Sequence, residues 1–209
     1  NEIQDIIAEY INDYNHKPLI LSVQTLFWCM KEYMEEKLNK DMRFTWIPFY
    51  KEFAEKIMHY RNDRKSLLDI IYANDDSLII NYLHDNKGEG DLCKDIDPFT
   101  TLGIFNRGIT EDNRKVGEEK FKELLSIEAE APSDFTGIPI LNNQMSHFFG
   151  FRNKRGKDDI ENLWKLFEKV VRGEDFKSEY DTVIRQYIIN VNITMGLFWI
   201  RPEEYLALD

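Results

Sequence analysis

Apolar residues recur at helical spacing along most of the chain. Between residues 157 and 171 they fall on one face of a helix, at Ile160, Leu163, Trp164, Phe167 and Val171. Similar stripes predict helices over residues 2–14, 19–38, 44–60, 67–72, 110–127 and 176–189. The sequence therefore predicts a multi-helical globular protein of the mainly α class, with about eight to ten helices.

The segment near the carboxy-terminal end has a different pattern. Residues 191–200 read VNITMGLFWI, and their β-branched and aromatic side chains favour a strand. We therefore expect a small β element there, with an α+β fold as the second choice. Polar residues 39–41 indicate a linker, so the expected domains are a helical hairpin at 1–43 and a main domain at 44–209.

A helix-start signal stands in residues 95–108, DIDPFTTLGIFNRG. Asp97 suits the N-cap and Pro98 the first helical position, while Gly108 is expected to end the element in the left-handed conformation. One interpretation is a well-capped core helix. The other is that Asn106 and Arg107 are presented to a ligand at the helix end.

Charge restricts the possible partners. The net charge of −11 counts against a simple phosphate-binding surface, although charge can be segregated on a protein. Residues 151–157, FRNKRGK, form a compact basic cluster beside an aromatic residue. Residues 142–144 are three amides followed by phenylalanines, and amides can pair with base edges while aromatic rings stack on bases. A solvated loop and a helix cap are the plainer interpretations.

No catalytic or metal-binding motif is recognisable. Cys29 and Cys93 lack the spacing of a zinc site, and lone cysteines suggest a reducing cytoplasm. The E-x-K triplet at 118–120 falls on a predicted helix, unlike the strand-borne triplet of many nucleases. Residues 85–91 fail the calcium-loop pattern. No apolar run is long enough to span a membrane.

Five segments, in order, resemble one known family. They are WIPFY at 46–50, DIDPFTTLGIFNRG at 95–108, FTGIPILNN at 135–143, DDIENLWKLFE at 158–168 and NITMGLFWIRP at 192–202. Together they resemble the amino-terminal region of bacterial McrB-like AAA+ proteins, homologues of the 5-methylcytosine-specific restriction enzyme B. The resemblance covers most of residues 44–209 and does not extend to residues 1–43.

The resemblance implies a parent protein with a carboxy-terminal AAA+ motor, which would use GTP or ATP with magnesium, form an oligomer and work with a nuclease subunit. Neither Walker motif is present, so no cofactor is expected in this chain. The chain would be the front module, a non-catalytic DNA-recognition domain of a modification-dependent restriction system in the cytoplasm, with no membrane partner.

The residues expected to contact DNA are polar or aromatic side chains of the basic cluster, the amide run and the helix ends. They are Asn106, Arg107, Asn142, Asn143, Gln144, Phe149, Arg152, Lys154, Arg155, Trp199 and Arg201. The alternative is an assembly domain of the same restriction ATPase without direct DNA contact, which the negative charge favours. An enzyme acting on nucleic acid is a weaker third option, because it has no motif to support it.

Overall fold

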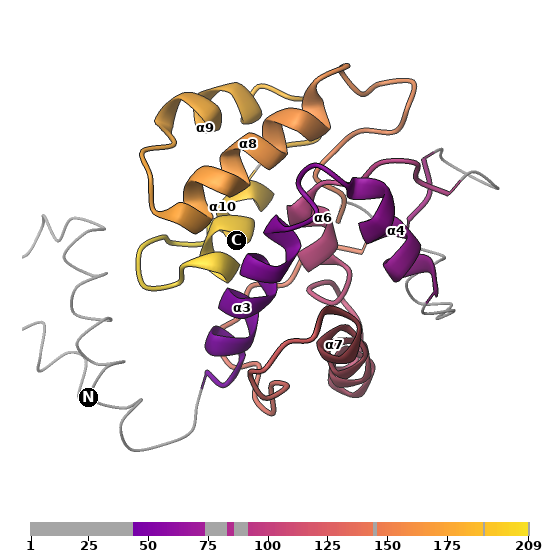
Figure 1. Cartoon of the computed structure of the whole chain (residues 1–209). Coiled ribbons are helices and arrows are strands. Elements are labelled where there is room, and N and C mark those ends of the chain that lie inside the picture. The colour runs from indigo at the N-terminus through magenta and orange to yellow at the C-terminus, as the bar shows by residue number, and fades with distance from the viewer. Residues whose placement is uncertain (1–43, 74–82, 86–91, 144–145, 190, 209) are drawn as a thin grey trace, which may run out of the picture. The chain divides into compact units, whose positions relative to one another are not determined.

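Figure 1 shows the computed structural model, which describes residues 44–73, 83–85, 92–143, 146–189 and 191–208. The chain divides into two compact units, Asn1–Phe44 and Thr45–Asp209. The helices predicted over 2–14 and 19–38, and the linker at 39–41, lie outside the described residues.

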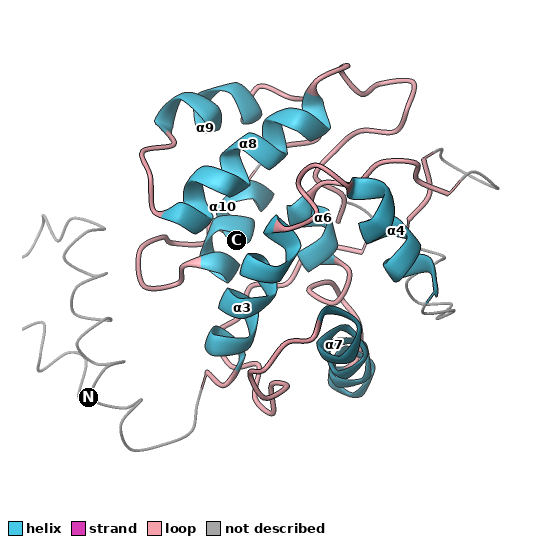
Figure 2. Cartoon of the chain, viewed as in Figure 1, coloured by secondary structure: helices cyan, strands magenta, loops and turns pink. Residues whose placement is uncertain are grey.

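The described part of the chain is helical, which confirms the mainly α class. Its helices are α3 (Trp46–Met58), α4 (Arg64–Ala73), α6 (Pro98–Gly103), α7 (Glu111–Leu125), α8 (Asp159–Arg172), α9 (Lys177–Val183) and α10 (Asn192–Ile200). Figure 2 shows these helices joined by long loops, and the described residues contain isolated β-bridges but no strand. No helix in the described ranges has the length and apolar character needed to cross a membrane.

Local capping signals set the starts of two helices. The Asp97 side chain accepts hydrogen bonds from the backbone N–H groups of Phe99 and Thr100, and Pro98 occupies the first helical position of α6. The Thr110 hydroxyl accepts from the backbone N–H of Asn113 at the start of α7. The Asp97 cap confirms the prediction, and both caps satisfy N–H groups that have no partner within the helix.

Helix α6 ends earlier than the sequence suggests. Its C-cap is Ile104, which keeps a right-handed conformation, and Gly108 is not among the residues with positive φ. The prediction of a left-handed Gly108 was therefore wrong. The segment after α6 is instead held by a neighbouring segment, through the parallel bridge between Arg107 and Leu141.

The predicted carboxy-terminal strand was also wrong, because residues 192–200 form helix α10. A continuous apolar run fits a buried strand and a buried helix equally well, so periodicity could not separate them. Helix α10 is buried on nearly all sides, and it packs against α3, α6 and α8. Gly196 permits this approach, since a Cβ atom there would lie 2.6 Å from Phe99 Cδ1.

The core is built around aromatic side chains of α3. Phe53 packs edge-on against Phe105 and Phe121, with ring centroids 5.3 and 5.4 Å away. The three tryptophans of this unit are fully buried, and each donates its indole N–H to a backbone carbonyl, at Thr136 for Trp46, Ile96 for Trp164 and Pro139 for Trp199. These bonds fix the loops that run over the helices.

Candidate functional site

The structure brings two of the predicted polar segments together. The backbone N–H of Leu141 donates to the carbonyl of Asn106 across 2.8 Å. Two residues further along each segment, Asn143 Nδ2 donates to the carbonyl of Gly108, also across 2.8 Å. We call residues 106–108 and 141–143 the paired segments. Asn142 and Asn143 are exposed, whereas Arg107 is half-buried. Gln144 lies outside the described residues.

Asn106 itself is an internal residue. It is fully buried, its Nδ2 donates to the carbonyl of Leu102 at 3.0 Å, and its Oδ1 lies 2.7 Å from Tyr50 Oη. Arg107 Nε donates to the carbonyl of Ile104 at 3.0 Å. The Asn106 side chain therefore fixes the course of the chain beneath the paired segments. It is not accessible to a ligand in this structure.

Tyr50 also contacts a buried acid that the sequence analysis missed. Glu118 Oε1 lies 2.7 Å from Tyr50 Oη, and burial raises the Glu118 pKa to about 8. A signal was present in the sequence, because Glu118 stands three residues before Phe121 and seven before Leu125, on the apolar face of α7. The helix confirms that the E-x-K triplet lies outside any strand.

The basic cluster folds around a buried acid from far away in the sequence. Asp85 is 1% exposed, and it accepts from Arg152 Nε and Nη2 at 3.2 Å and from Arg155 Nη1 at 2.7 Å. Its carbonyl accepts from the backbone N–H of Arg152 at 3.0 Å. We call residues 151–157 the basic loop. Its two arginines anchor it, and Asp85 offsets one of their charges.

Lys154, on the same loop, contacts Tyr187. It is exposed, its Nζ lies 3.1 Å from Tyr187 Oη, and it stands 5.1 Å from the centre of the Tyr187 ring. Tyr187 is 53% exposed and was not predicted as a site residue. Asn153 and Lys157 are exposed on the same loop. The Lys154 cation and the Tyr187 ring thus share one surface.

The backbone holds Tyr187 in place. A Cβ atom at Gly150 would lie 3.0 Å from Tyr187 Cδ1, so the ring rests against a position that suits glycine. The next residue, Ile188, has a φ of 77°. A left-handed conformation is costly for a β-branched residue, and such strain gathers at functional sites.

Three predicted contacts have structural roles in the fold. Phe149 and Trp199 are 1% and 0% exposed, and the Arg155 guanidinium lies 5.1 Å from the Phe149 ring. Arg201 donates from Nη1 to the carbonyl of Val170 at 3.3 Å and forms an ion pair with Glu204. It therefore closes the carboxy-terminal end of α8, where cations are favoured.

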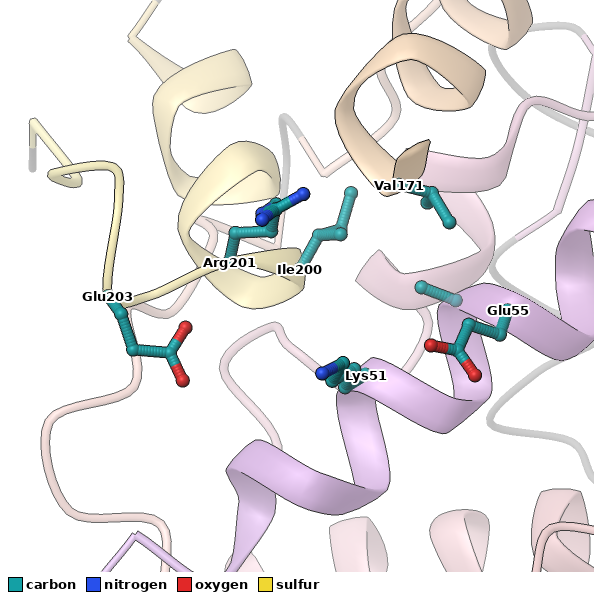
Figure 3. Close-up of a pocket in the computed structure, with 7 residues that line it drawn as sticks. Lys51, Glu55, Val171, Ile200, Arg201 and Glu203 are labelled. Carbon is teal, nitrogen blue, oxygen red and sulfur yellow. The ribbon is translucent and has the colours of Figure 1, made fainter. Parts of the chain in front are cut away.

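Arg201 also borders a hollow between α3 and α10, drawn in Figure 3. Its volume is about 200 Å³, and it is lined by Lys51, Ala54, Glu55, Val171, Ile200, Arg201 and Glu203. Two cations and two anions share the rim, so the hollow has no net charge to select a ligand.

The described residues hold neither a cluster of metal ligands nor a reactive thiol. They contain no group of three or more His, Cys, Asp or Glu side chains that could hold a metal ion. Burial raises the pKa of Cys93 to about 12, which suppresses the reactive thiolate. His147 is half-buried and packs beside Phe149, with ring centroids 5.2 Å apart.

Comparison with known proteins gives one relationship. No curated protein and no solved structure matches the chain. A family described as a domain of unknown function, DUF8425, matches residues 46–209, which is most of the chain and includes every described helix. The chain therefore belongs to the DUF8425 family.

Proposed function

We propose that the chain is a non-catalytic DNA-recognition module of a modification-dependent, McrBC-type restriction system. The observation that carries the proposal is the anchored basic loop. Buried Asp85 holds Arg152 and Arg155, while Lys154 projects into solvent beside the exposed ring of Tyr187. The resemblance of five ordered segments to McrB-like proteins supports the same class of partner.

The basic loop supplies the groups that a nucleic acid needs. Arg152 has a side chain that is 46% exposed and, with Lys154, can approach phosphates, which provide most of the affinity for DNA. Tyr187 offers a ring for contact with sugar or base. Because the loop is already fixed by Asp85, its ordering costs little on binding.

The net charge of −11 sets the expected strength of binding. Acidic residues elsewhere repel DNA at long range, and salt screens that repulsion beyond about 10 Å. A single module should therefore bind weakly. In the proposed parent protein, an oligomeric motor driven by GTP or ATP with magnesium would present several modules at once and recruit a nuclease subunit, so that weak contacts add up.

Lys154 is the residue to test first. Lys154→Ala removes an exposed cation without disturbing a buried ion pair. The affinity of the variant should depend less steeply on salt, with the magnitude of the slope of log affinity against log salt reduced by about one. Arg152 and Arg155 are less suitable, because their removal leaves Asp85 buried without its counter-charges. Lys177→Ala, an exposed lysine at the start of α9, is the matched control.

The measurement is fluorescence anisotropy with matched duplexes, with and without 5-methylcytosine, at two salt concentrations. We expect binding that weakens with salt, is reduced by Lys154→Ala and is unchanged by Lys177→Ala. A preference for one duplex would show whether the methyl group is read. Absence of binding to both duplexes at low salt would overturn the proposal.

The second candidate is an assembly role without DNA contact. Val116 and Leu124 on α7 are 46% and 39% exposed, and they lie on one side of the helix because they are eight residues apart. A protein partner that packs on this side of α7 would cover both side chains. If duplex binding fails, Val116→Ser and Leu124→Ser tested by light scattering on the parent oligomer would address this role.

A further inference from the structure

Three buried side chains form a polar cluster between α3 and α7. Tyr50, Asn106 and Glu118 are each 0% exposed, and we call them the inner cluster. Tyr50 Oη lies 2.7 Å from Asn106 Oδ1 and 2.7 Å from Glu118 Oε1. Both distances are typical of O–H···O hydrogen bonds.

The number of protons determines which group donates. A tyrosine hydroxyl carries one proton, so it can donate to only one of its two neighbours. The Asn106 amide is oriented by its Nδ2, which donates to the Leu102 carbonyl, so its Oδ1 faces Tyr50 and can only accept. Tyr50 therefore donates to Asn106, and the bond to Glu118 requires a proton on the Glu118 carboxyl.

The surroundings of Glu118 favour that proton. Burial is the largest cause and raises the Glu118 pKa, while the charges of Arg114 and Lys115, and the hydrogen bond that Tyr50 would donate to an ionised Glu118, act in the opposite direction. The titratable or charged groups acting on Glu118 are thus Tyr50 from α3 and two cations of α7 itself. Asn106, from the segment after α6, is uncharged. Glu118 Oε2 has no hydrogen-bond partner, which disfavours a buried carboxylate.

Arg114 does not form the missing pair with Glu118. Its Nε donates to the Phe105 carbonyl at 2.9 Å, and its guanidinium lies 4.8 Å from the centre of the Phe135 ring. The cation acts on Glu118 through space, and the second carboxyl oxygen stays without a donor.

We propose that Glu118 is a proton switch that controls the paired segments through Tyr50 and Asn106. When Glu118 is neutral, it donates to Tyr50, and Tyr50 donates to Asn106. When Glu118 loses its proton to water, the Tyr50 hydroxyl turns and donates to the carboxylate. Asn106 Oδ1 then loses its donor, and all protons are accounted for.

The consequence reaches the surface through the backbone of Asn106. Its carbonyl accepts from Leu141, beside the exposed residues Asn142 and Asn143. Loss of the hydrogen bond from Tyr50 makes Asn106 more mobile. The backbone hydrogen bond from Leu141 to the Asn106 carbonyl then opens more often. The switch lies apart from the basic loop and does not depend on the proposed DNA binding.

Glu118→Gln tests the switch with little change of shape. Its amide can donate to Tyr50 as the neutral acid does, but it does not ionise. Hydrogen exchange of the Leu141 amide, corrected for the intrinsic rate at each pH, should show wild-type protection falling about tenfold more than that of the variant as pH rises through 8. Glu119→Gln, the exposed neighbour on α7, should behave as wild type.

A second measurement needs no variant. In protein with ¹³C-labelled glutamate carboxyls, one carboxyl resonance should titrate with a pKa of about 8. The amide resonances of Leu141 and Gly108 should move with the same midpoint. Equal exchange profiles for wild type and Glu118→Gln would overturn the proposal. If the variant does not fold, the absence of a carboxyl titrating above neutral pH in wild type would overturn it.

Discussion

At the scale of single residues, Asp85 decides whether the basic loop is ordered. It is the acid between two arginines, and its side chain is 2% exposed. Asp85→Asn keeps the shape but leaves Arg152 and the mostly buried Arg155 without a counter-charge. We expect a loss of about 2–4 kcal/mol in the free energy of unfolding. Urea denaturation measures it. Asp69→Asn, in an exposed pair with Lys65, should change little, and equal effects of both variants would contradict the anchor role.

Asp97 gives a prediction about pH. Burial is the largest cause that raises its pKa, from 3.8 to about 6, and its Oδ2 has no hydrogen-bond partner. The folded state therefore holds this proton more tightly than the unfolded state, so its contribution to stability falls as pH rises from about 4 to about 6 and is constant above. Asparagine also caps helices but does not titrate.

The stability of Asp97→Asn relative to wild type should accordingly increase with pH across that window and then level off. Urea unfolding of both proteins at several pH values provides the comparison. Asp112→Asn, an exposed acid in the first turn of α7, removes the same formal charge and serves as control. A difference between wild type and Asp97→Asn that does not vary with pH would show that Asp97 titrates alike in both states.

At the scale of elements, two helical glycines should respond in opposite ways to alanine. A Cβ at Gly196 in α10 would lie 2.6 Å from Phe99 Cδ1, whereas a Cβ at Gly117 in α7 would meet its nearest atom at 4.0 Å. Gly196→Ala should therefore destabilise by about 1–3 kcal/mol through overpacking. Gly117→Ala should stabilise by about 0.5–1 kcal/mol, because alanine favours helix. Thermal unfolding checks both signs, and a stabilising Gly196→Ala would mean that α10 is not closely packed.

The same helices show what the sequence can predict. Helices α7 and α8 have one apolar face each, and their apolar stripes place them within a few residues. Helix α10 is buried on nearly all sides, so it has no alternation of polar and apolar residues and was predicted as a strand. The helices that bury α10 are α3, α6 and α8. The local sequence pattern of α10 carries no information about these distant neighbours.

The candidate site was predictable to a similar extent. The cluster of cations in the basic loop is visible in seven consecutive residues. Its partner Asp85 is 67 residues from Arg152, so only the tertiary fold pairs them. The burial of Phe149 and Trp199, and the exposure of Tyr187, also depend on packing between distant segments.

At the scale of the whole molecule, the described helices form a unit with its own core. The chain divides after Phe44, and the family match begins at residue 46. Thr45 belongs to this core unit, because its hydroxyl accepts from the backbone N–H groups of Ser133 and Asp134, each across 3.0 Å. Trp46 adds its indole bond to the Thr136 carbonyl. The amino-terminal edge of the unit therefore holds the loop at 133–136.

These bonds predict where the chain can be shortened. A fragment of residues 45–209 should keep a single cooperative urea transition, followed by the fluorescence of Trp46, Trp164 and Trp199, which are all buried. A fragment starting at Phe49 lacks the bonds of Thr45 and Trp46 and leaves a gap beside Tyr50, whose ring centroid lies 5.6 Å from that of Trp46. Its free energy of unfolding should fall by several kcal/mol, since removal of a buried tryptophan side chain costs about 3–5 kcal/mol.

If both fragments unfold at the same urea concentration, the loop at 133–136 does not depend on this edge. If neither folds, the core requires residues before Thr45.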